Sequence, residues 1–287
     1  MSIFISEDRL VRWIQRRGAA THTRKHSNIN KISLSGITLV CLTGFESIVR
    51  TFFTEIIQHF EEPITLITVE TDGFDMKKEY LENDKIKHWF TWNKPFDHPK
   101  LTCIPIGLNF DRQSISLNRW LASASRPIRD KNLLVNFSAK THASRAGLLE
   151  KGRGEWSSFC DTVVSVPDGE VKWVKSMISV PQKIEITHPS YYGLLSRYKF
   201  VLSPPGYGLD CHRTWEALYV GAIPIVLSSS IDSLYEGLPI LVVKSWDEIT
   251  ESFLERRYNE IMDKKCDISR MYMGYWISKI ENSIAKK

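Results

Sequence analysis

The sequence predicts an α/β fold of two successive domains, because apolar segments of strand length alternate with segments of helical periodicity. In the first half, residues 37–43 form an apolar run that ends at Gly44, and residues 45–60 follow with apolar side chains at helical spacing. Two further predicted strands, 63–69 and 100–105, complete a strand–helix–strand rhythm. That rhythm is typical of a parallel sheet covered by helices.

The same rhythm restarts in the second half of the chain, and 287 residues are enough for two domains of ordinary size. The predicted strands there are 132–137, 162–166, 198–203, 223–227 and 240–243. A polar segment at 114–131 is the expected linker, which gives domains at 1–125 and 126–265. Residues 266–287 contain a predicted amphipathic helix, and its pattern does not specify which domain it packs on.

The charge of the chain is concentrated at its start. Residues 1–31 carry a net charge of +5, whereas the rest holds 31 basic and 31 acidic residues. This segment could be a surface helix packed by Leu10, Trp13 and Ile14, or it could touch a membrane surface or a polyanion. Because the remainder is neutral, we do not expect nucleic-acid binding. No apolar block of a secretory signal or a membrane span is present, so the expected location is cytoplasmic.

The five cysteines are scattered and never spaced as Cys-x-x-Cys. This pattern argues against both a disulfide framework and a zinc site, and we expect reduced, mostly buried thiols.

The segment most informative about chemistry is 198–221. An apolar strand ends at Ser203, a turn rich in Pro and Gly follows, and Asp210 is the expected N-cap of a helix that Gly221 closes. A strand, a glycine-containing loop and a helix amino terminus together favour phosphate binding, because free backbone N–H groups and the helix dipole attract an anion.

Two charged residues of this predicted helix, Arg213 and Glu216, are three positions apart and share one face. An arginine in the first turn can bind a diphosphate with both arms of its guanidinium, and a carboxylate one turn deeper can accept both hydroxyls of a ribose. Elsewhere such a couple would be an ordinary surface pair. The preceding loop and strand favour the nucleotide interpretation here.

At these positions the sequence resembles the exostosin-like glycosyltransferases. The resemblance rests on SPPGYG at 203–208, DCHRTWEAL at 210–218 and GAIPIV at 221–226, with LPI at 238–240 and WDEI at 246–249 downstream, and it covers most of 130–260. It implies a GT-B fold of two facing Rossmann-like domains with a cleft between them, and a donor nucleotide in the carboxyl-terminal domain.

The resemblance also implies roles for individual residues. Arg213 and Glu216 would contact the diphosphate and the ribose, and Arg145, which follows the strand at 132–137, would approach the leaving diphosphate. The full expected donor-binding set is Lys140, Arg145, Ser203, Gly206, Tyr207, Gly208, Asp210, His212, Arg213 and Glu216.

The first domain resembles the acceptor side of some relatives less closely, through ETD at 70–72, WFTWN at 89–93, HPKL at 98–101 and PIGL at 105–108. Those relatives often have Asn where this chain has Glu70, so the resemblance assigns no role to that position. The resemblance implies inversion of the anomeric carbon in a single displacement, and we expect its general base in the first domain. Asp72 is the first candidate because it follows a predicted parallel strand, where ligands bind in open sheets. Its reserves are Asp75, Glu46 and His22. Asp75 and Trp92 are the expected acceptor contacts; Trp92 could equally fill the core.

The resemblance therefore implies an inverting glycosyltransferase that uses a UDP-sugar and a glycan acceptor, and UDP-xylose is the favoured donor. No Asp-x-Asp tripeptide occurs, so we expect no metal and no other cofactor; Arg145, Arg213 and backbone N–H groups would stabilise the diphosphate. We expect a monomer. The alternative is a non-catalytic nucleotide- or glycan-binding protein of the same fold.

Overall fold

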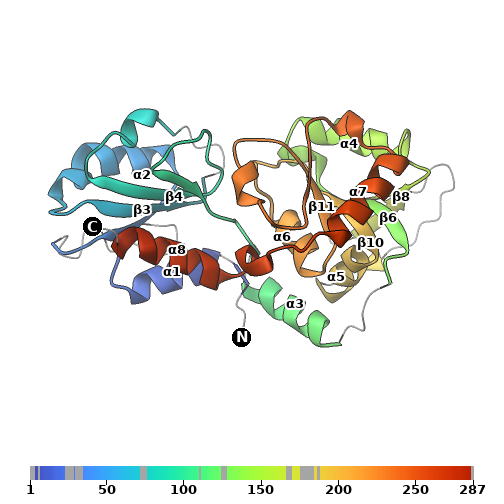
Figure 1. Cartoon of the computed structure of the whole chain (residues 1–287), viewed down its shortest axis with the longest axis horizontal. Helices are drawn as coiled ribbons and strands as arrows, with labels where there is room; N and C mark the ends of the chain where they lie inside the picture. The colour runs from blue at the N-terminus through green and yellow to red at the C-terminus, as the bar shows by residue number, and fades with distance from the viewer. Residues whose placement is uncertain are drawn as a thin grey trace.

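The protein consists of two α/β lobes, each built on a sheet whose central strands are parallel (Figure 1). The first lobe is at the left of Figure 1 and the second at the right. The expected fold class, two Rossmann-like domains, is confirmed. The computed structural model describes residues 4–5, 7–22, 29, 35–71, 76–109, 111–123, 128–165, 170–174, 184–185 and 188–285.

The first lobe contains a five-stranded parallel sheet in the order β1-β2-β3-β4-β5. Its strands are β1 (Ala20–His22), β2 (Leu39–Thr43), β3 (Ile64–Val69), β4 (Ile86–Thr91) and β5 (Leu101–Cys103). Every residue of β2 and β3 is buried, as expected for parallel strands covered on both faces. Helix α2 (Glu46–Thr51) follows β2 and continues through a π-helical turn (Phe52–Ile56) and a 3-10 turn (Ile57–His59).

The second lobe contains a seven-stranded sheet in the order β12-β11-β10-β6-β7-β8-β9. Its strands are β6 (Lys131–Val135), β7 (Cys160–Ser165), β8 (Glu170–Val174), β9 (Ile184–Glu185), β10 (Tyr198–Leu202), β11 (Ile223–Leu227) and β12 (Leu241–Val243). The strands from β12 to β7 are parallel, whereas β8 and β9 add an antiparallel edge. The helices are α4 (Ser144–Arg153), α5 (His188–Ser196), α6 (His212–Tyr219) and α7 (Glu251–Asp263).

The last helix, α8 (Met273–Ala285), leaves the second lobe and packs on β3 and β4 of the first (Figure 1). It lies beside α1 (Glu7–Arg16), and an ion pair between Arg17 and Glu281 at 3.2 Å joins the two segments. The partner of the carboxyl-terminal helix, which the sequence pattern left open, is therefore the first lobe.

Tyr219, at the end of α6, connects both ends of the chain. Its hydroxyl donates to the Met271 carbonyl at 2.6 Å and accepts from the Ile5 N–H at 3.2 Å. Its ring packs on Phe4, with ring centroids 4.6 Å apart. The helix that follows the predicted phosphate loop is thus fixed by segments from both termini.

More than half of the expected linker at 114–131 is helical. Helix α3 (Asp111–Ser123) packs on α5 of the second lobe. Ser114 and Leu117 are fully buried, and Trp120 is partly buried three residues further on the same face. Packing of that face outweighs the low helix propensity of a serine-rich segment.

Four strands were not predicted: β1, β4, β8 and β9. Strand β4 lies inside the first sheet, between β3 and β5, and its aromatic residues Trp89 and Phe90 are core residues. Strands β8 and β9 lie at the edge of the second sheet. There the formation of a strand depends on contacts with the neighbouring strands rather than on a run of apolar residues in the sequence.

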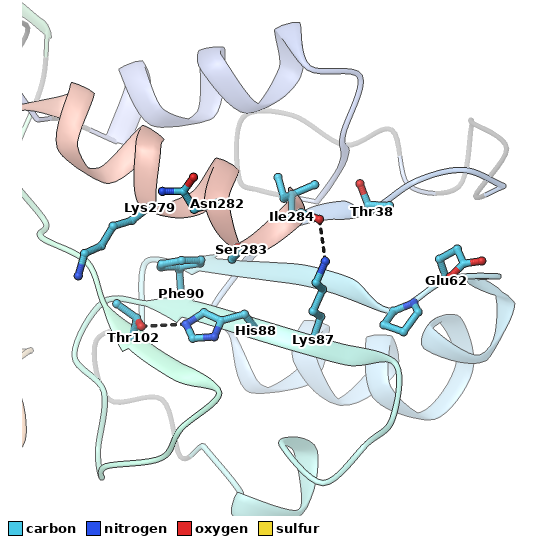
Figure 2. Close-up of a pocket in the computed structure, with 11 residues that line it drawn as sticks. Thr38, Glu62, Lys87, His88, Phe90, Thr102, Lys279, Asn282, Ser283 and Ile284 are labelled. Carbon is cyan, nitrogen blue, oxygen red and sulfur yellow. Dashed lines mark hydrogen bonds between the residues drawn. The ribbon is translucent and has the colours of Figure 1, made fainter. Parts of the chain in front are cut away.

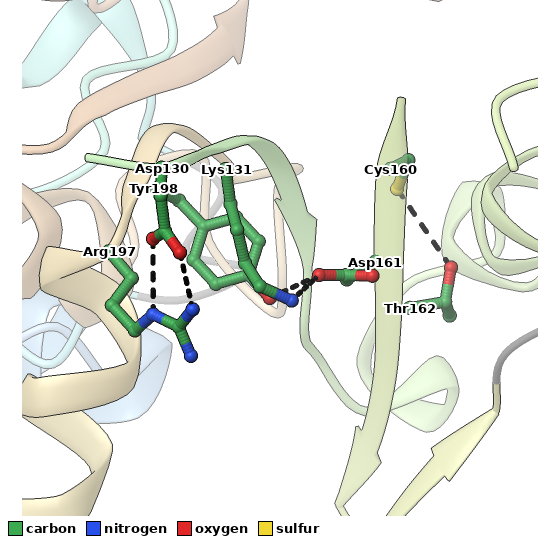
Figure 3. Close-up of polar contacts among 7 residues, drawn as sticks. All are labelled: Asp130, Lys131, Cys160, Asp161, Thr162, Arg197 and Tyr198. Carbon is green, nitrogen blue, oxygen red and sulfur yellow. Dashed lines mark hydrogen bonds and ion pairs between the residues drawn. The ribbon is translucent and has the colours of Figure 1, made fainter. Parts of the chain in front are cut away.

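Polar contacts also join the parallel strands of the second lobe (Figure 3). Asp161 on β7 accepts from the Tyr198 hydroxyl of β10 at 2.7 Å and forms an ion pair with Lys131 of β6. Asp130 and Arg197 form a second ion pair, which is exposed. The five cysteines are free, and three of them are buried; burial raises the pKa of Cys103 and of Cys160 to about 12.

Candidate active site

The predicted phosphate loop lies between β10 and α6, as the sequence indicated. The N-cap of α6 is Cys211, with extended backbone (φ −128°, ψ 141°) and no side-chain cap, so the expectation that Asp210 caps this helix is wrong. The Asp210 carboxylate instead accepts hydrogen bonds from groups of both lobes. Helix α6 therefore begins without a capping side chain, and the Thr214 N–H of its first turn donates to the Cys211 carbonyl at 3.0 Å.

A pocket of about 290 Å³ opens at this loop. Eight of its lining residues were predicted as donor-binding: Arg145, Gly206, Tyr207, Gly208, Asp210, His212, Arg213 and Glu216. Ile106 and Asn109, from the segment that leads out of the first lobe, complete the wall together with Thr141 and Cys211. The structure thus brings most of the predicted donor site together.

Arg145 lies beneath the Pro-Gly turn and is 5% exposed. Its Nε donates to the Pro205 carbonyl at 2.8 Å, and Nη2 donates to the Pro204 carbonyl at 2.9 Å. A Cβ at Gly206 would come within 3.1 Å of the same Nη2, so the loop approaches the guanidinium closely. Burial lowers the pKa of Arg145, but the side chain stays charged because its unperturbed pKa is so high.

Arg213 shares an aromatic platform with Arg145. The two guanidinium carbons lie 5.7 Å and 5.3 Å from the centroid of the Phe137 ring. The Arg213 Nε is buried and has no hydrogen-bond partner among the described residues. A buried donor without a partner is rare in native proteins and calls for a ligand or a water molecule. Two positive charges and an unsatisfied donor therefore border the pocket.

Glu216 supplies the carboxylate of the pocket and is 7% exposed. The hydroxyl of Tyr191, from α5, donates to Oε2 at 3.0 Å. Burial raises the pKa of Glu216, and the charge of Arg213 and the Tyr191 hydrogen bond act against that rise. The side chain is held in one place in the pocket wall, one helical turn below Arg213.

Asp210 and His212 connect the loop to the segment that leaves the first lobe. Asp210 accepts from the Ile106 N–H at 2.9 Å and from the Trp215 indole at 2.9 Å. The Nδ1 of His212 lies 2.7 Å from the Gly107 carbonyl; because a carbonyl only accepts, Nδ1 carries the proton. Burial raises the pKa of Asp210 to about 7 and lowers that of His212.

The remaining predicted residues lie elsewhere. Ser203 is buried, and its hydroxyl pairs with that of Thr214 at 2.8 Å. Lys140 is exposed on a 3-10 turn (Ala139–Thr141) and does not line the pocket. Trp92 is 4% exposed, so its ring packs in the core and presents no face to an acceptor. Its burial follows from its place directly after β4.

The structure does not describe the side chains of several predicted acceptor-side residues. Asp72 and Asp75 lie outside the described residues, as does the side chain of His22. Glu46 is exposed and forms an ion pair with Arg50, four residues along α2.

Besides the wall residues Ile106, Asn109, Thr141 and Cys211, sequence reasoning missed three residues that contact the wall: Phe137, Tyr191 and Asn93. The Asn93 Oδ1 accepts from the Asp210 N–H at 2.7 Å, although the two residues are 117 positions apart. Phe137 could have been found from its place at the end of a strand, beside the predicted basic loop. No local signal marks Tyr191 or Asn93, because their partners lie on distant segments.

A larger pocket of about 1060 Å³ lies on the first lobe, between α8 and the sheet (Figure 2). Polar groups in its wall pair with one another: Lys87 Nζ donates to the Ile284 carbonyl at 2.6 Å, and His88 Nε2 lies 2.8 Å from the Thr102 hydroxyl. None of the predicted site residues lines this pocket, and among its described lining residues no buried side-chain donor or acceptor is left without a hydrogen-bond partner.

Two further properties concern the described residues alone. Among them, no three His, Cys, Asp or Glu side chains come together in a way that could hold a metal ion. No helix in this part of the chain combines the length and the apolar character needed to cross a membrane.

Comparisons with known proteins add little. No protein-family model matches the sequence, and no curated protein matches it. Among solved structures, the chain is similar to an α,α-trehalose-phosphate synthase (UDP-forming) from Burkholderia vietnamiensis. The TM-score is 0.41 with 8% sequence identity, over 84% of this chain and 70% of that one. At this level the similarity carries no inference about activity.

Proposed function

We propose that the chain is a glycosyltransferase whose donor, a nucleoside-diphosphate sugar, binds in the pocket beneath the 203–211 loop. The observation that carries the proposal is the buried, unpartnered Nε of Arg213, on the same aromatic ring as the Arg145 guanidinium. Two guanidinium groups and a helix amino terminus suit a diphosphate. Glu216, one turn deeper, suits the paired hydroxyls of a ribose.

This arrangement supports a reaction in a single displacement. A hydroxyl oxygen of the acceptor forms a bond to the anomeric carbon while the bond from that carbon to the β-phosphate oxygen breaks. The electron pair leaves with the diphosphate, and the acceptor proton passes to a base of the first lobe. Arg145 and Arg213 stabilise the negative charge that builds on the leaving group, which lowers the barrier of the chemical step. Attack from the face opposite the diphosphate inverts the anomeric carbon.

The proposal includes the enzyme family, the donor base, the donor sugar and the acceptor. The motifs at 203–226 support an exostosin-like enzyme, and with it uridine as the donor base and an inverting reaction that needs no metal. UDP-xylose is the favoured donor, and a glycan hydroxyl is the acceptor.

The experiment that tests the proposal has two stages. Thermal unfolding is measured first with UDP, GDP and uridine, each with Mg²⁺ or with EDTA. We expect UDP to stabilise the protein by about 2.7 kcal/mol at a hundred times its Kd, and uridine to do so far less, because it lacks the phosphates. Release of UDP from UDP-xylose, UDP-glucose and UDP-N-acetylglucosamine is then measured with water or aryl glycosides as acceptors.

The outcomes separate the alternatives. UDP binding with turnover in EDTA supports the metal-independent transferase. UDP binding without turnover of any donor supports the non-catalytic binding protein of the same fold. A protein that binds no nucleoside diphosphate contradicts both.

A further inference from the structure

Two residues of the described chain other than glycine adopt positive φ: Glu70 at 55° and Asn93 at 50°. This left-handed region is uncommon for any residue with a side chain. Asparagine tolerates it better than most residues, because its short amide can hydrogen-bond locally, whereas glutamate gains no such compensation. The surrounding structure must therefore hold Glu70 in this conformation.

The two residues follow the neighbouring parallel strands β3 and β4 at one edge of the first sheet. Thr68 of β3 pairs with Thr91 of β4, and the Trp92 N–H donates to the Thr68 carbonyl at 3.4 Å. Glu70 directly follows β3, and Asn93 is the second residue after β4; the Thr71 hydroxyl donates to the Trp92 carbonyl at 2.7 Å, so the two segments stay in contact beyond the last paired residues. This edge is formed by the carboxyl ends of the parallel strands, where open α/β sheets bind their ligands.

The conformation of Asn93 serves the contact between the lobes. Its side-chain oxygen accepts the hydrogen bond from the Asp210 N–H at 2.7 Å, at the end of the loop that borders the donor pocket. The sheet edge that carries Glu70 and Asn93 therefore faces the donor pocket of the second lobe.

Glu70 is also held by its neighbours. The Thr43 hydroxyl, at the end of β2, donates to Oε2 at 2.8 Å. The Gly44 N–H donates to the Val69 carbonyl at 2.6 Å, and a Cβ at position 44 would meet the Thr71 side chain at 2.4 Å. Thr71 in turn donates from its hydroxyl to the Trp92 carbonyl at 2.7 Å. Glycine would adopt the backbone of residue 70 without strain, so what glutamate adds there is its carboxylate.

We infer that Glu70 is the general base of the transfer, an inference that rests on the proposed function. Its carboxylate takes the proton from the acceptor hydroxyl as the acceptor oxygen bonds to the anomeric carbon and the diphosphate departs with the electron pair. The proton then passes to solvent. Thr43 is a positioning residue, because it orients the carboxylate and does not touch the acceptor. This assignment replaces Asp72, two residues further along, as the first candidate.

The test compares four variants with the wild type: Glu70→Gln, Glu70→Gly, Thr43→Val and Asp72→Asn. Two quantities are measured for each, the affinity for UDP and the kcat for release of UDP from the best of the three donors. Glu70→Gln keeps the size of the side chain and an oxygen that can accept from Thr43. We expect it to lower kcat at least 100-fold, as loss of a general base does, with the Kd of UDP within twofold of wild type.

The other variants separate chemistry from structure. Glu70→Gly relieves the positive φ, so we expect a Tm no lower than that of the wild type together with the same loss of kcat. Thr43→Val should lower kcat about threefold to tenfold, because the carboxylate is still present. Asp72→Asn should retain more than a tenth of wild-type kcat.

Two results would overturn the inference while leaving the proposed function intact. One is wild-type UDP affinity with more than a tenth of wild-type kcat in either Glu70 variant. The other is a 100-fold loss in Asp72→Asn with turnover retained in Glu70→Gln. A wild-type protein that binds no UDP overturns the proposed function and this inference together.

Discussion

The Asp210 carboxylate accepts a hydrogen bond from the backbone N–H of Ile106 at 2.9 Å, so the donor-side loop is anchored on the segment that leads out of the first lobe. The same residue donates its own N–H to Asn93 of the first lobe. The Tyr235 hydroxyl also donates to the Asp210 carboxylate, with its oxygen 3.4 Å from Oδ1. A single buried carboxylate therefore connects the pocket, α6 and the first lobe.

The protonation of the Asp210 carboxylate predicts that the free energy of unfolding depends on pH. Burial raises the pKa of Asp210 in the folded protein from 3.8 to about 7, although the surrounding donors act against the rise. A raised carboxyl pKa means that the folded state binds this proton more tightly than the unfolded state does. The stabilisation is complete below about pH 4 and is lost as the pH rises to about 7.

The measurement is the free energy of unfolding by urea at pH 4.5, 5.5, 6.5 and 7.5, for the wild type and for Asp210→Asn. The asparagine variant does not titrate at this position. The difference between the two proteins should change by up to about 1.4 kcal/mol per pH unit in this window, with the wild type losing its advantage at higher pH. Parallel curves would show that Asp210 titrates as it does in the unfolded chain.

Arg213→Met should weaken UDP binding about 10- to 100-fold, because a charge-assisted hydrogen bond to phosphate contributes about 1.5–3 kcal/mol. Methionine keeps an apolar stem over Phe137 and removes the unpartnered Nε, so we expect no loss of folding stability. Calorimetric titration with UDP measures the effect. Arg197→Met is the matched control, since it removes the same charge from the exposed pair with Asp130 (Figure 3). Equal losses in both variants would indicate a general charge effect.

Glu216→Gln tests the other end of the nucleotide. Glutamine can still accept from the Tyr191 hydroxyl, but it accepts ribose hydroxyls through one oxygen in place of two. We expect UDP affinity to fall about tenfold, a loss of about 1.4 kcal/mol, and affinity for inorganic pyrophosphate to stay unchanged. An equal loss for both ligands would place Glu216 away from the ribose.

The sequence predicted the site best where the functional residues lie close together along the chain. Residues 203–216 contain a strand end, a Pro-Gly turn and the first turns of a helix, so backbone geometry alone brings Arg213 and Glu216 to one pocket. Strands β2, β3, β10 and β11 are apolar runs between turns, and they were predicted for that reason. The periodicity of β4 is weaker, because Lys87 and His88 interrupt its apolar residues.

The contacts between the lobes could not be predicted from the sequence. Asp210 has the residue type and position of an N-cap, yet its carboxylate is used by Ile106 and Trp215. His212 has the residue type of a phosphate ligand, yet its Nδ1 pairs with the Gly107 carbonyl. The contacts of Asp210 with Ile106 and of His212 with Gly107 each join residues about 105 positions apart. Only the folded structure shows that these segments meet.

Gly107→Ala should destabilise the protein more than any other substitution considered so far. The residue has a φ of +65°, and a Cβ there would lie 2.4 Å from the Ile5 carbonyl oxygen, which is backbone and cannot move aside. Gly18→Ala is the matched control, because Gly18 has a φ of +70° with no atom within 4 Å of the added Cβ. The control should lose about 1 kcal/mol of unfolding free energy through backbone strain, and Gly107→Ala at least about 2 kcal/mol more through overpacking.

The affinity for UDP shows whether the displacement at residue 107 also changes the pocket. Because the Gly107 carbonyl accepts from His212 at 2.7 Å, displacing residue 107 shifts the start of α6 and with it Arg213. We therefore expect Gly107→Ala to weaken UDP binding measurably at a temperature where it remains folded, while Gly18→Ala binds UDP as the wild type does. Equal thermal shifts and equal UDP affinities in the two variants would mean that the segment next to Gly107 gives way without moving α6, and that the anchor between the lobes does not position the donor site.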